Sequence, residues 1–159
     1  MNFIKGRCDN KLKKIYSKID GELLHIIHRL DDMIHSRTDV IPEDNFLQLA
    51  VLNMNNGKTF RPHRHIYKPV TYGKVIAQES WVVIRGSVKV LLYDIEGEDT
   101  ISEPVLKAGD VSITLRGGHT YEILEDDTIA YEYKTGPYEG QSLDKEFIKI
   151  ASDSWLGGP

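Results

Sequence analysis

Short runs of β-branched and aromatic residues follow one another through most of this chain, and this series constrains the fold more than any other feature. The runs cover residues 46–53, 81–85, 88–93, 111–115, 119–124 and 128–134. Turn signals separate them, among them Asn55-Asn56-Gly57, Arg85-Gly86-Ser87 and Arg116-Gly117-Gly118. Runs of this length and spacing favour a β-sandwich or barrel over alternating strands and helices. We therefore predict a mainly β domain over residues 42–159, with residues 143–150 as a further strand or a short helix.

The chain before Pro42 has a different period. Gaps of three and four separate its apolar residues, which are Leu12, Ile15, Ile19, Leu23, Leu24, Ile26, Ile27, Leu30, Met33 and Ile34. Such gaps are typical of one face of a helix. Gly21 interrupts the pattern, and Asp20 can cap a second helix that ends near His35. We predict an N-terminal helical segment over residues 1–41.

Composition excludes several classes of protein. The chain has 159 residues, one Cys and a net charge of −4. One Cys makes no internal disulfide and no Cys-rich zinc module. The acidic balance argues against a nucleic-acid partner. No run approaches the roughly 20 apolar residues of a membrane span, and the first residues do not resemble a signal peptide. We expect a soluble, cytoplasmic protein without a membrane partner.

Three of the six histidines, His25, His28 and His35, belong to the predicted helical segment. At about 100° per residue they form one stripe on the side opposite the apolar residues. Either this stripe is a surface site for a metal or for pH sensing, or it is a solvated helix face that carries imidazoles.

His63 and His65 form a different pattern. Residues i and i+2 of a strand point to the same side, so that these two imidazoles converge on one point. Gly57 precedes His63 by five intervening residues, and Glu79 precedes Gly86 by six. His119 follows later, after the Gly109-Asp110 turn.

These spacings resemble the two sequence motifs of the cupin superfamily. The resemblance implies a small jelly-roll β-barrel that holds one divalent metal ion, with His63, His65, Glu79 and His119 as ligands. Three imidazoles and a carboxylate suit Fe, Mn, Ni, Co, Cu or Zn. Between His65 and Glu79 the chain has 13 residues, more than the motif usually has, and residues 69–73 read as the turn of a lengthened hairpin. Cupins commonly pair through strand edges, which implies a homodimer.

Other segments narrow the resemblance. They are residues 61–65, residues 82–86 running into residues 90–94, and the ending Tyr133-Lys134-Thr135-Gly136-Pro137-Tyr138 followed by residues 144–147. Together these segments resemble the WbuC-type cupin-fold metalloproteins of bacterial surface-polysaccharide gene clusters. The similarity covers roughly residues 46–150.

Four residues are candidates for binding a substrate. Arg61 shares the side of His63 and His65, and it either clamps a carboxylate or phosphate or forms a salt bridge at the rim. Tyr131 and Tyr133 alternate with Glu132, so either the two tyrosines or Glu132 face the interior. Lys134, with Tyr138, closes one mouth of the barrel or belongs to a turn. We expect no role for Cys8 as ligand or nucleophile.

The expected function is that of a metal-dependent enzyme. A Lewis-acid metal would isomerise or epimerise a sugar or a sugar-nucleotide in surface-polysaccharide biosynthesis, which is what the resemblance implies. The alternatives are a non-haem iron dioxygenase with the same ligands and a non-catalytic cupin that binds a small molecule. The sequence leaves the catalytic residues unassigned.

Overall fold

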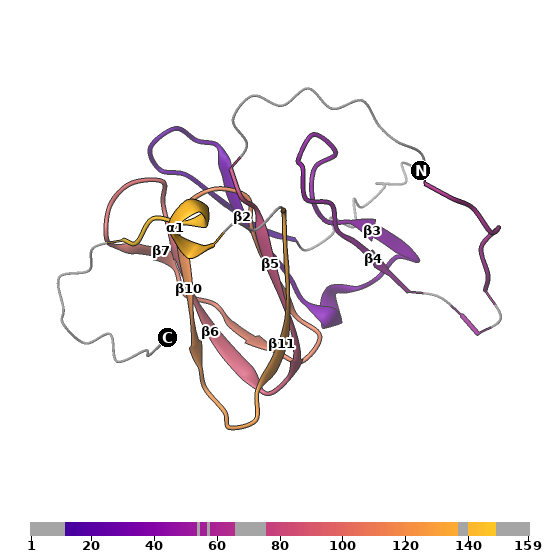
Figure 1. Ribbon diagram of the computed structural model, residues 1–159. Coiled ribbons are helices and arrows are strands. Elements are labelled where there is room, and N and C mark those ends of the chain that lie inside the picture. The colour runs from indigo at the N-terminus through magenta and orange to yellow at the C-terminus, as the bar shows by residue number, and fades with distance from the viewer. Residues whose placement is uncertain (1–11, 54, 57, 66–75, 137–139, 149–159) are drawn as a thin grey trace, which may run out of the picture.

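The computed structural model describes residues 12–53, 55–56, 58–65, 76–136 and 140–148. These residues are mainly β, as predicted (Figure 1). The strands of the largest sheet are β1 (Lys13–Tyr16), β2 (Leu23–His28), β9 (Val111–Thr114), β5 (Glu79–Arg85) and β11 (Ile129–Lys134), in this spatial order. A second sheet contains β10 (His119–Ile123), β6 (Ser87–Tyr93), β7 (Thr100–Ser102) and β8 (Val105–Lys107). β3 (Arg37–Asp39) and β4 (Ala50–Leu52) form a two-stranded sheet.

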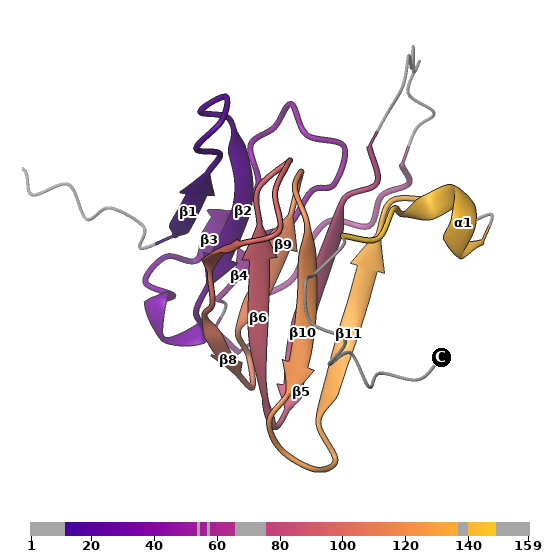
Figure 2. The same ribbon diagram turned by 90° about the vertical axis from the view of Figure 1, so that its left-hand side faces the viewer.

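Every strand pair is antiparallel, and the chain crosses between the two large sheets at four places. The connections from β5 to β6, from β8 to β9, from β9 to β10 and from β10 to β11 each join one sheet to the other. Figure 2 shows the smaller sheet in front of the larger one. Because β5 and β10 belong to different sheets, side chains at their ends can meet between the sheets. The described strands form open sheets, which are the two large ones and the β3–β4 pair, and no closed barrel.

The predicted N-terminal helices are wrong. Residues 13–28 form β1, a turn and β2, and within residues 12–41, the described part of the predicted helical segment, the only helical piece is the short 3-10 helix η1 (Leu30–Asp32). β2 lies between β1 and β9, and its residues 24–28 are all buried. A strand that is covered on both faces is apolar without alternation. The exposed edge strand β1, a turn and the buried strand β2 together produced gaps of three and four residues by coincidence.

The predicted histidine stripe is wrong for the same reason. His25 and His28 are buried in β2, with 0% and 2% of their surface exposed, whereas His35 is exposed. Strand residues that are an odd number of positions apart point to opposite faces. His25 and His28 are three positions apart, so they face different sides of the sheet. The stripe therefore does not exist as a surface.

The predicted strands after Pro42 are confirmed, with shifted ends. They correspond to β4, β5, β6, β9, β10 and β11. The run at residues 46–53 contributes only the three residues of β4. The sequence pattern missed β3, β7 and β8, each of three residues. Residues 141–144 form the short helix α1 (Gln141–Asp144).

Two apolar clusters cover the two faces of the larger sheet. Between the sheets lie Ile27, Val83, Val88, Val90, Leu92 and Leu106. On the outer face, Ile26, Val111, Ile113 and Leu115 pack against Val40 and Ile41. Polar side chains replace the apolar ones at one end of the space between the sheets, and this end carries the candidate site. No helix of the described residues is long and apolar enough to cross a membrane.

Candidate functional site

Glu79 and His119 form the centre of the candidate site. Glu79 is the first residue of β5, and His119 is the first residue of β10 in the facing sheet. Nε2 of His119 lies 3.1 Å from Oε1 of Glu79, and 22% and 15% of the two side chains are exposed. The pair therefore joins the two sheets by one hydrogen bond and remains accessible from one side.

The electrostatic surroundings keep Glu79 ionised. Burial alone would raise the pKa of this carboxyl group. The hydrogen bond and charge of His119, together with the charges of Lys145 and Lys134, outweigh burial and hold the pKa below its ordinary value. At neutral pH the site therefore presents a carboxylate beside an imidazole.

A row of polar side chains crosses the larger sheet at the level of Glu79. Strand register pairs His25 with Thr114, Thr114 with Glu79, and Glu79 with Lys134. Partners in register share one face of the sheet. Nδ1 of His25 lies 3.1 Å from Oγ1 of Thr114, and Nε2 of His25 lies 3.0 Å from the carbonyl oxygen of Tyr93. The row ends in an ion pair, in which Nζ of Lys134 donates to Asp144 at 2.9 Å.

The Glu79–His119 pair opens into a cavity of about 740 Å³. Among its lining residues are Thr114, Lys134, Asp144, Glu146 and Phe147. Residues 144–148, which begin with the last residue of α1, form one wall of this cavity. The cavity is large enough for a small organic molecule.

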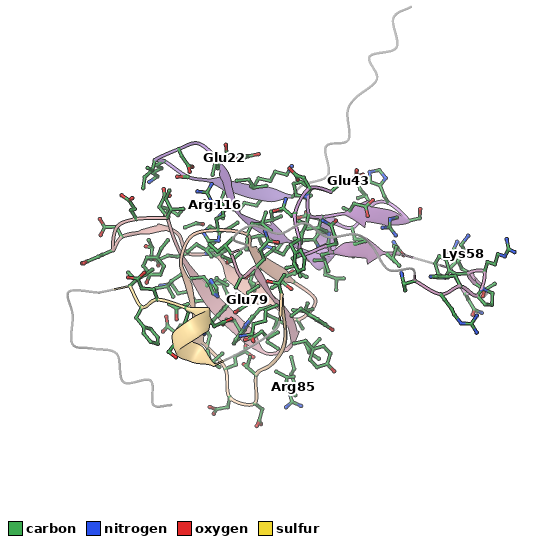
Figure 3. All side chains as sticks on the ribbon, turned by 45° about the horizontal axis from the view of Figure 1, so that its top comes forward. Glu22, Glu43, Lys58, Glu79, Arg85 and Arg116 are labelled. Carbon is green, nitrogen blue, oxygen red and sulfur yellow. The ribbon has the colours of Figure 1, made fainter. Side chains whose placement is uncertain are left out.

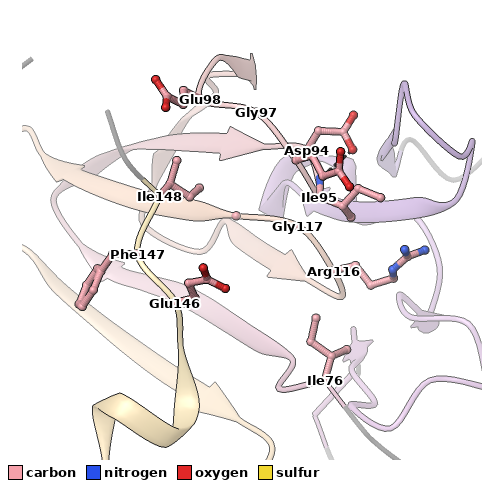
Figure 4. Close-up of a pocket in the computed structure, with 12 residues that line it drawn as sticks. Ile76, Asp94, Ile95, Gly97, Glu98, Arg116, Gly117, Glu146, Phe147 and Ile148 are labelled. Atoms are coloured by element: carbon pink, nitrogen blue, oxygen red, sulfur yellow. Dashed lines mark hydrogen bonds between the residues drawn. The ribbon is translucent and has the colours of Figure 1, made fainter. Parts of the chain in front are cut away.

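A second cavity, of about 680 Å³, adjoins the first (Figure 4). The two share Ile76, Gly117, Gly118, Glu146, Phe147 and Ile148. In Figure 4 Gly117 lies between the segment that carries Glu146, Phe147 and Ile148 on one side and Arg116 on the other. The other lining residues of the second cavity are Arg116 and the loop at residues 94–98, which contributes the acidic side chains of Asp94, Glu96 and Glu98.

His63 and His65 lie apart from the Glu79–His119 pair. Both side chains are exposed, in a segment without regular secondary structure. Lys58, which belongs to the same segment, lies well away from Glu79 in Figure 3. The two imidazoles lie close to each other, with ring centroids 5.3 Å apart. The structure thus brings the four predicted ligands together as two pairs.

The geometry of each pair suits metal ligation. Two ligand atoms at about 2.1 Å from one ion and about 90° apart lie about 3.0 Å from each other. The 3.1 Å between His119 and Glu79 matches this spacing. Nδ1 of His63 donates to the carbonyl oxygen of Arg61 at 3.0 Å, which leaves the lone pair on Nε2. Metal-binding histidines commonly make this kind of second hydrogen bond. Within the described part of the chain, no three His, Cys, Asp or Glu side chains are grouped closely enough to hold a metal ion.

The predicted substrate-binding residues occupy different places. Lys134 lines the larger cavity. Tyr131 and Tyr133 are 55% and 54% exposed, and they alternate with Glu132, which accepts a hydrogen bond from Nε1 of Trp81 at 3.2 Å. Glu132 therefore shares the inner face with Trp81, and the two tyrosines point outward. Arg61 is exposed in the segment of His63 and His65. Cys8, Tyr138 and the expected turn at residues 69–73 lie outside the described residues.

Sequence reasoning missed His25, Thr114 and Asp144 as parts of this site. His25 was assigned to a helix, which removed it from consideration. The run Ser112-Ile113-Thr114 did carry a usable signal, because two small hydroxyl residues alternate with an apolar one. Such alternation on a strand indicates a polar lining on one face.

Fold and site together define a class: an antiparallel two-sheet β protein with a carboxylate–imidazole pair in a cavity between the sheets. Comparison of the chain with models of known protein families, with curated protein sequences and with solved structures found no match. The functional conclusion therefore depends on the site itself.

Proposed function

We propose that this protein is a metalloprotein of the cupin type, in which Glu79 and His119 bind one divalent transition metal ion together with His63 and His65. The observation that carries the proposal is the 3.1 Å approach of His119 to Glu79 at the edge of a cavity. The passage of the chain from one sheet to the other at four places supports the jelly-roll part of the proposal. The sequence motifs around His63, Glu79 and His119 support the ligand set.

The chain is long enough for the second pair of ligands to join the first. Thirteen residues separate His65 from Glu79. A segment of this length can extend over about 40 Å. The hydrogen bond from His63 to Arg61 already selects the tautomer in which Nε2 accepts a metal. Completion of the site therefore requires a rearrangement of the segment that carries His63 and His65, without refolding of either sheet.

We further propose that the protein is an enzyme that isomerises or epimerises a sugar or a sugar-nucleotide. The bound ion would act as a Lewis acid that polarises a carbonyl group or lowers the pKa of a hydroxyl group. Lys145 and the Lys134–Asp144 ion pair lie in the cavity wall, where they can contact polar groups of a bound molecule. Glu146 also lines the cavity, and its carboxylate is suited to accept a proton there.

Metal analysis tests the proposed centre directly. Chelator-free protein should carry about one divalent ion per chain, or take one up when Mn²⁺, Fe²⁺, Co²⁺, Ni²⁺ or Zn²⁺ is added. The variants H63A, H65A, E79Q and H119A should each lose most of this uptake, because each removes one of four ligands. H35A is the matched control, since His35 is an exposed histidine outside the site and its removal should change nothing.

Two results would contradict the proposal. The first is wild-type protein that neither contains nor takes up metal, and the second is unchanged uptake by H63A and H65A. For the catalytic part, incubation of the metal-loaded protein with sugars under nitrogen should give isomers detectable by NMR. Oxygen uptake by the iron-loaded protein would instead indicate a dioxygenase.

A further inference from the structure

We propose that Thr114 is the hydrogen-bond acceptor through which the cavity binds a hydroxyl group of a neutral polyol. His25 is the positioning residue, because it accepts the hydroxyl proton of Thr114 and leaves only the lone pairs of that hydroxyl group for the ligand. This inference rests on the proposed function, because it takes from that proposal that a ligand binds beside Glu79 and His119. It narrows the substrate class from sugars and sugar-nucleotides to uncharged, hydroxyl-rich molecules.

The hydrogen bonds of His25 determine which atom carries each proton. A backbone carbonyl oxygen only accepts, so Nε2 of His25 must donate to Tyr93. In a neutral imidazole the other ring nitrogen is then an acceptor. The hydroxyl group of Thr114 must therefore donate its proton to Nδ1 of His25, 3.1 Å away.

Burial keeps His25 neutral. None of its surface is exposed, and this burial lowers its pKa to about 4. A doubly protonated ring would place a second N–H against Thr114 and would reverse their hydrogen bond. At neutral pH this form is rare, so the hydroxyl proton of Thr114 stays committed to His25.

Thr114 consequently presents only lone pairs to the cavity. It lines the cavity and is paired in register with Glu79, which places their Cβ atoms about 5 Å apart. The carboxylate of Glu79 also accepts hydrogen bonds and cannot donate them. This wall of the cavity is therefore matched to a ligand group that donates, such as a hydroxyl.

The charges of the described lining residues argue against a phosphorylated ligand. In the larger cavity, Lys134 is already paired with Asp144. The other charged lining side chains there are one basic, Lys145, and two acidic, Glu79 and Glu146. The adjoining cavity contributes four more side chains, one basic and three acidic. They are Arg116, Asp94, Glu96 and Glu98, and Arg116 is paired with Asp20 at 2.9 Å. A polyanion such as a sugar-nucleotide would be repelled, whereas neutral hydroxyl groups can donate to these carboxylates.

Gly117 holds the positioning group in place. Its φ angle is +80°, and a Cβ at this residue would lie 2.7 Å from the carbonyl oxygen of Tyr93 and 3.2 Å from Nε2 of His25. Only glycine lets the loop after β9 approach this hydrogen bond so closely. The His25–Tyr93 bond is therefore enclosed on the side where water would otherwise compete.

The first experiment is long-range ¹H–¹⁵N NMR of the histidine rings in chelator-free protein at pH 7. We expect the proton of His25 on Nε2 and an unprotonated Nδ1. A proton on Nδ1, or a doubly protonated ring, would overturn the inference. The tautomer is measured without any ligand or metal, so this result does not depend on the proposed metal centre.

The second experiment measures the binding of myo-inositol and of myo-inositol 1-phosphate by calorimetry. The variants are T114V, which removes the acceptor, and T114S, which keeps it. We expect T114V to bind myo-inositol about tenfold more weakly than wild type, and T114S to stay within about threefold. The phosphate ester should bind wild type more weakly than myo-inositol does. Circular dichroism checks that both variants fold.

The inference is overturned if T114V and T114S bind myo-inositol equally, if the phosphate ester binds more tightly, or if wild type binds no myo-inositol. Metal uptake is measured on the same samples. Normal uptake without polyol binding contradicts only this inference. Polyol binding with the expected tautomer, but without metal uptake, contradicts only the proposed metal centre.

Discussion

His25 and His119 differ in chemistry although both are histidines between the same two sheets. His25 has both ring nitrogens in hydrogen bonds and no exposed surface. His119 shares a hydrogen bond with a carboxylate and is partly exposed at a cavity. Burial favours the neutral ring of His25, whereas Nε2 of His119 faces the carboxylate of Glu79. At the scale of the residue, surroundings and not residue type separate the structural role of His25 from the binding role that we propose for His119.

The burial of His25 predicts a dependence of stability on pH. The pKa of His25 is about 4 in the folded protein and about 6.5 in the unfolded chain. Below pH 6.5 the unfolded state therefore binds more protons, so that stability is greatest above pH 6.5 and falls as the pH is lowered towards 4. Between pH 7.5 and pH 5 this group should remove about 2 kcal/mol from the free energy of unfolding.

Urea unfolding of wild type and of H25Q at both pH values measures the contribution of His25. Glutamine keeps a donor for Tyr93 and does not titrate, so the stability of H25Q should change less between these pH values. His28 also has a pKa that burial lowers, which outweighs the opposite effect of Asp32 and Asp110, and it remains in both proteins. An equal loss of stability in wild type and H25Q would refute the assignment to His25.

Strand β2 determines how the N-terminal part of the chain contributes to the fold. It lies between β1 and β9, and Ile26 and Ile27 belong to the apolar clusters on opposite faces of the sheet. Ile19, in the turn before β2, is 55% exposed. A helical stripe would have buried Ile19 and Ile27 alike. In the structure Ile19 is exposed in the turn, whereas Ile27 is buried in β2. At the scale of the element, this difference can be measured.

We predict unequal effects of two identical substitutions. I27A removes a side chain that is 1% exposed between the sheets and should lower the free energy of unfolding by about 3 kcal/mol. I19A removes an exposed side chain and should change it by less than about 0.5 kcal/mol. Chemical denaturation monitored by circular dichroism gives both values. Equal losses for the two variants would favour the helical interpretation instead.

The two large sheets act together at the scale of the whole molecule. Trp81 of β5 stacks on Tyr121 of β10, with ring centroids 4.0 Å apart. Two residues earlier in each of these strands, Glu79 of β5 meets His119 of β10. Hydroxyl groups of Tyr121 and Ser112 lie 3.0 Å apart across the same space. The candidate site therefore depends on the correct packing of one sheet on the other.

A metal ion held by both sheets should raise the stability of the whole molecule. A free metal concentration of 100 times the dissociation constant adds about 2.7 kcal/mol to the free energy of unfolding. We predict a higher Tm for wild type in the presence of the metal and no such increase for E79Q, which loses the ligand from the larger sheet. Differential scanning calorimetry with and without the metal makes the comparison. An equal increase for E79Q would place the metal elsewhere.

The sequence predicted much of the fold after Pro42 and half of the candidate site. β-Branched runs and glycine turns located six of the strands, because turn chemistry is local. Glu79 and His119 were paired by a motif, and the structure brings them into contact. The orientation of Tyr131 and Tyr133 remained open, because alternation alone does not say which face of β11 lies inside. The register of β11 on β5 decides this by placing Glu132 next to Trp81.

The sequence by itself determined that this chain is mainly β, that its turns lie at particular glycines, and that Glu79 and His119 are the residues to examine. These features depend on backbone preferences and on side-chain chemistry that each residue carries with it. Only the tertiary structure decided that residues 23–28 form a buried strand, and that His25 commits the hydroxyl proton of Thr114. Burial and hydrogen-bond partners arise from residues distant in the chain, so periodicity within one segment does not contain them.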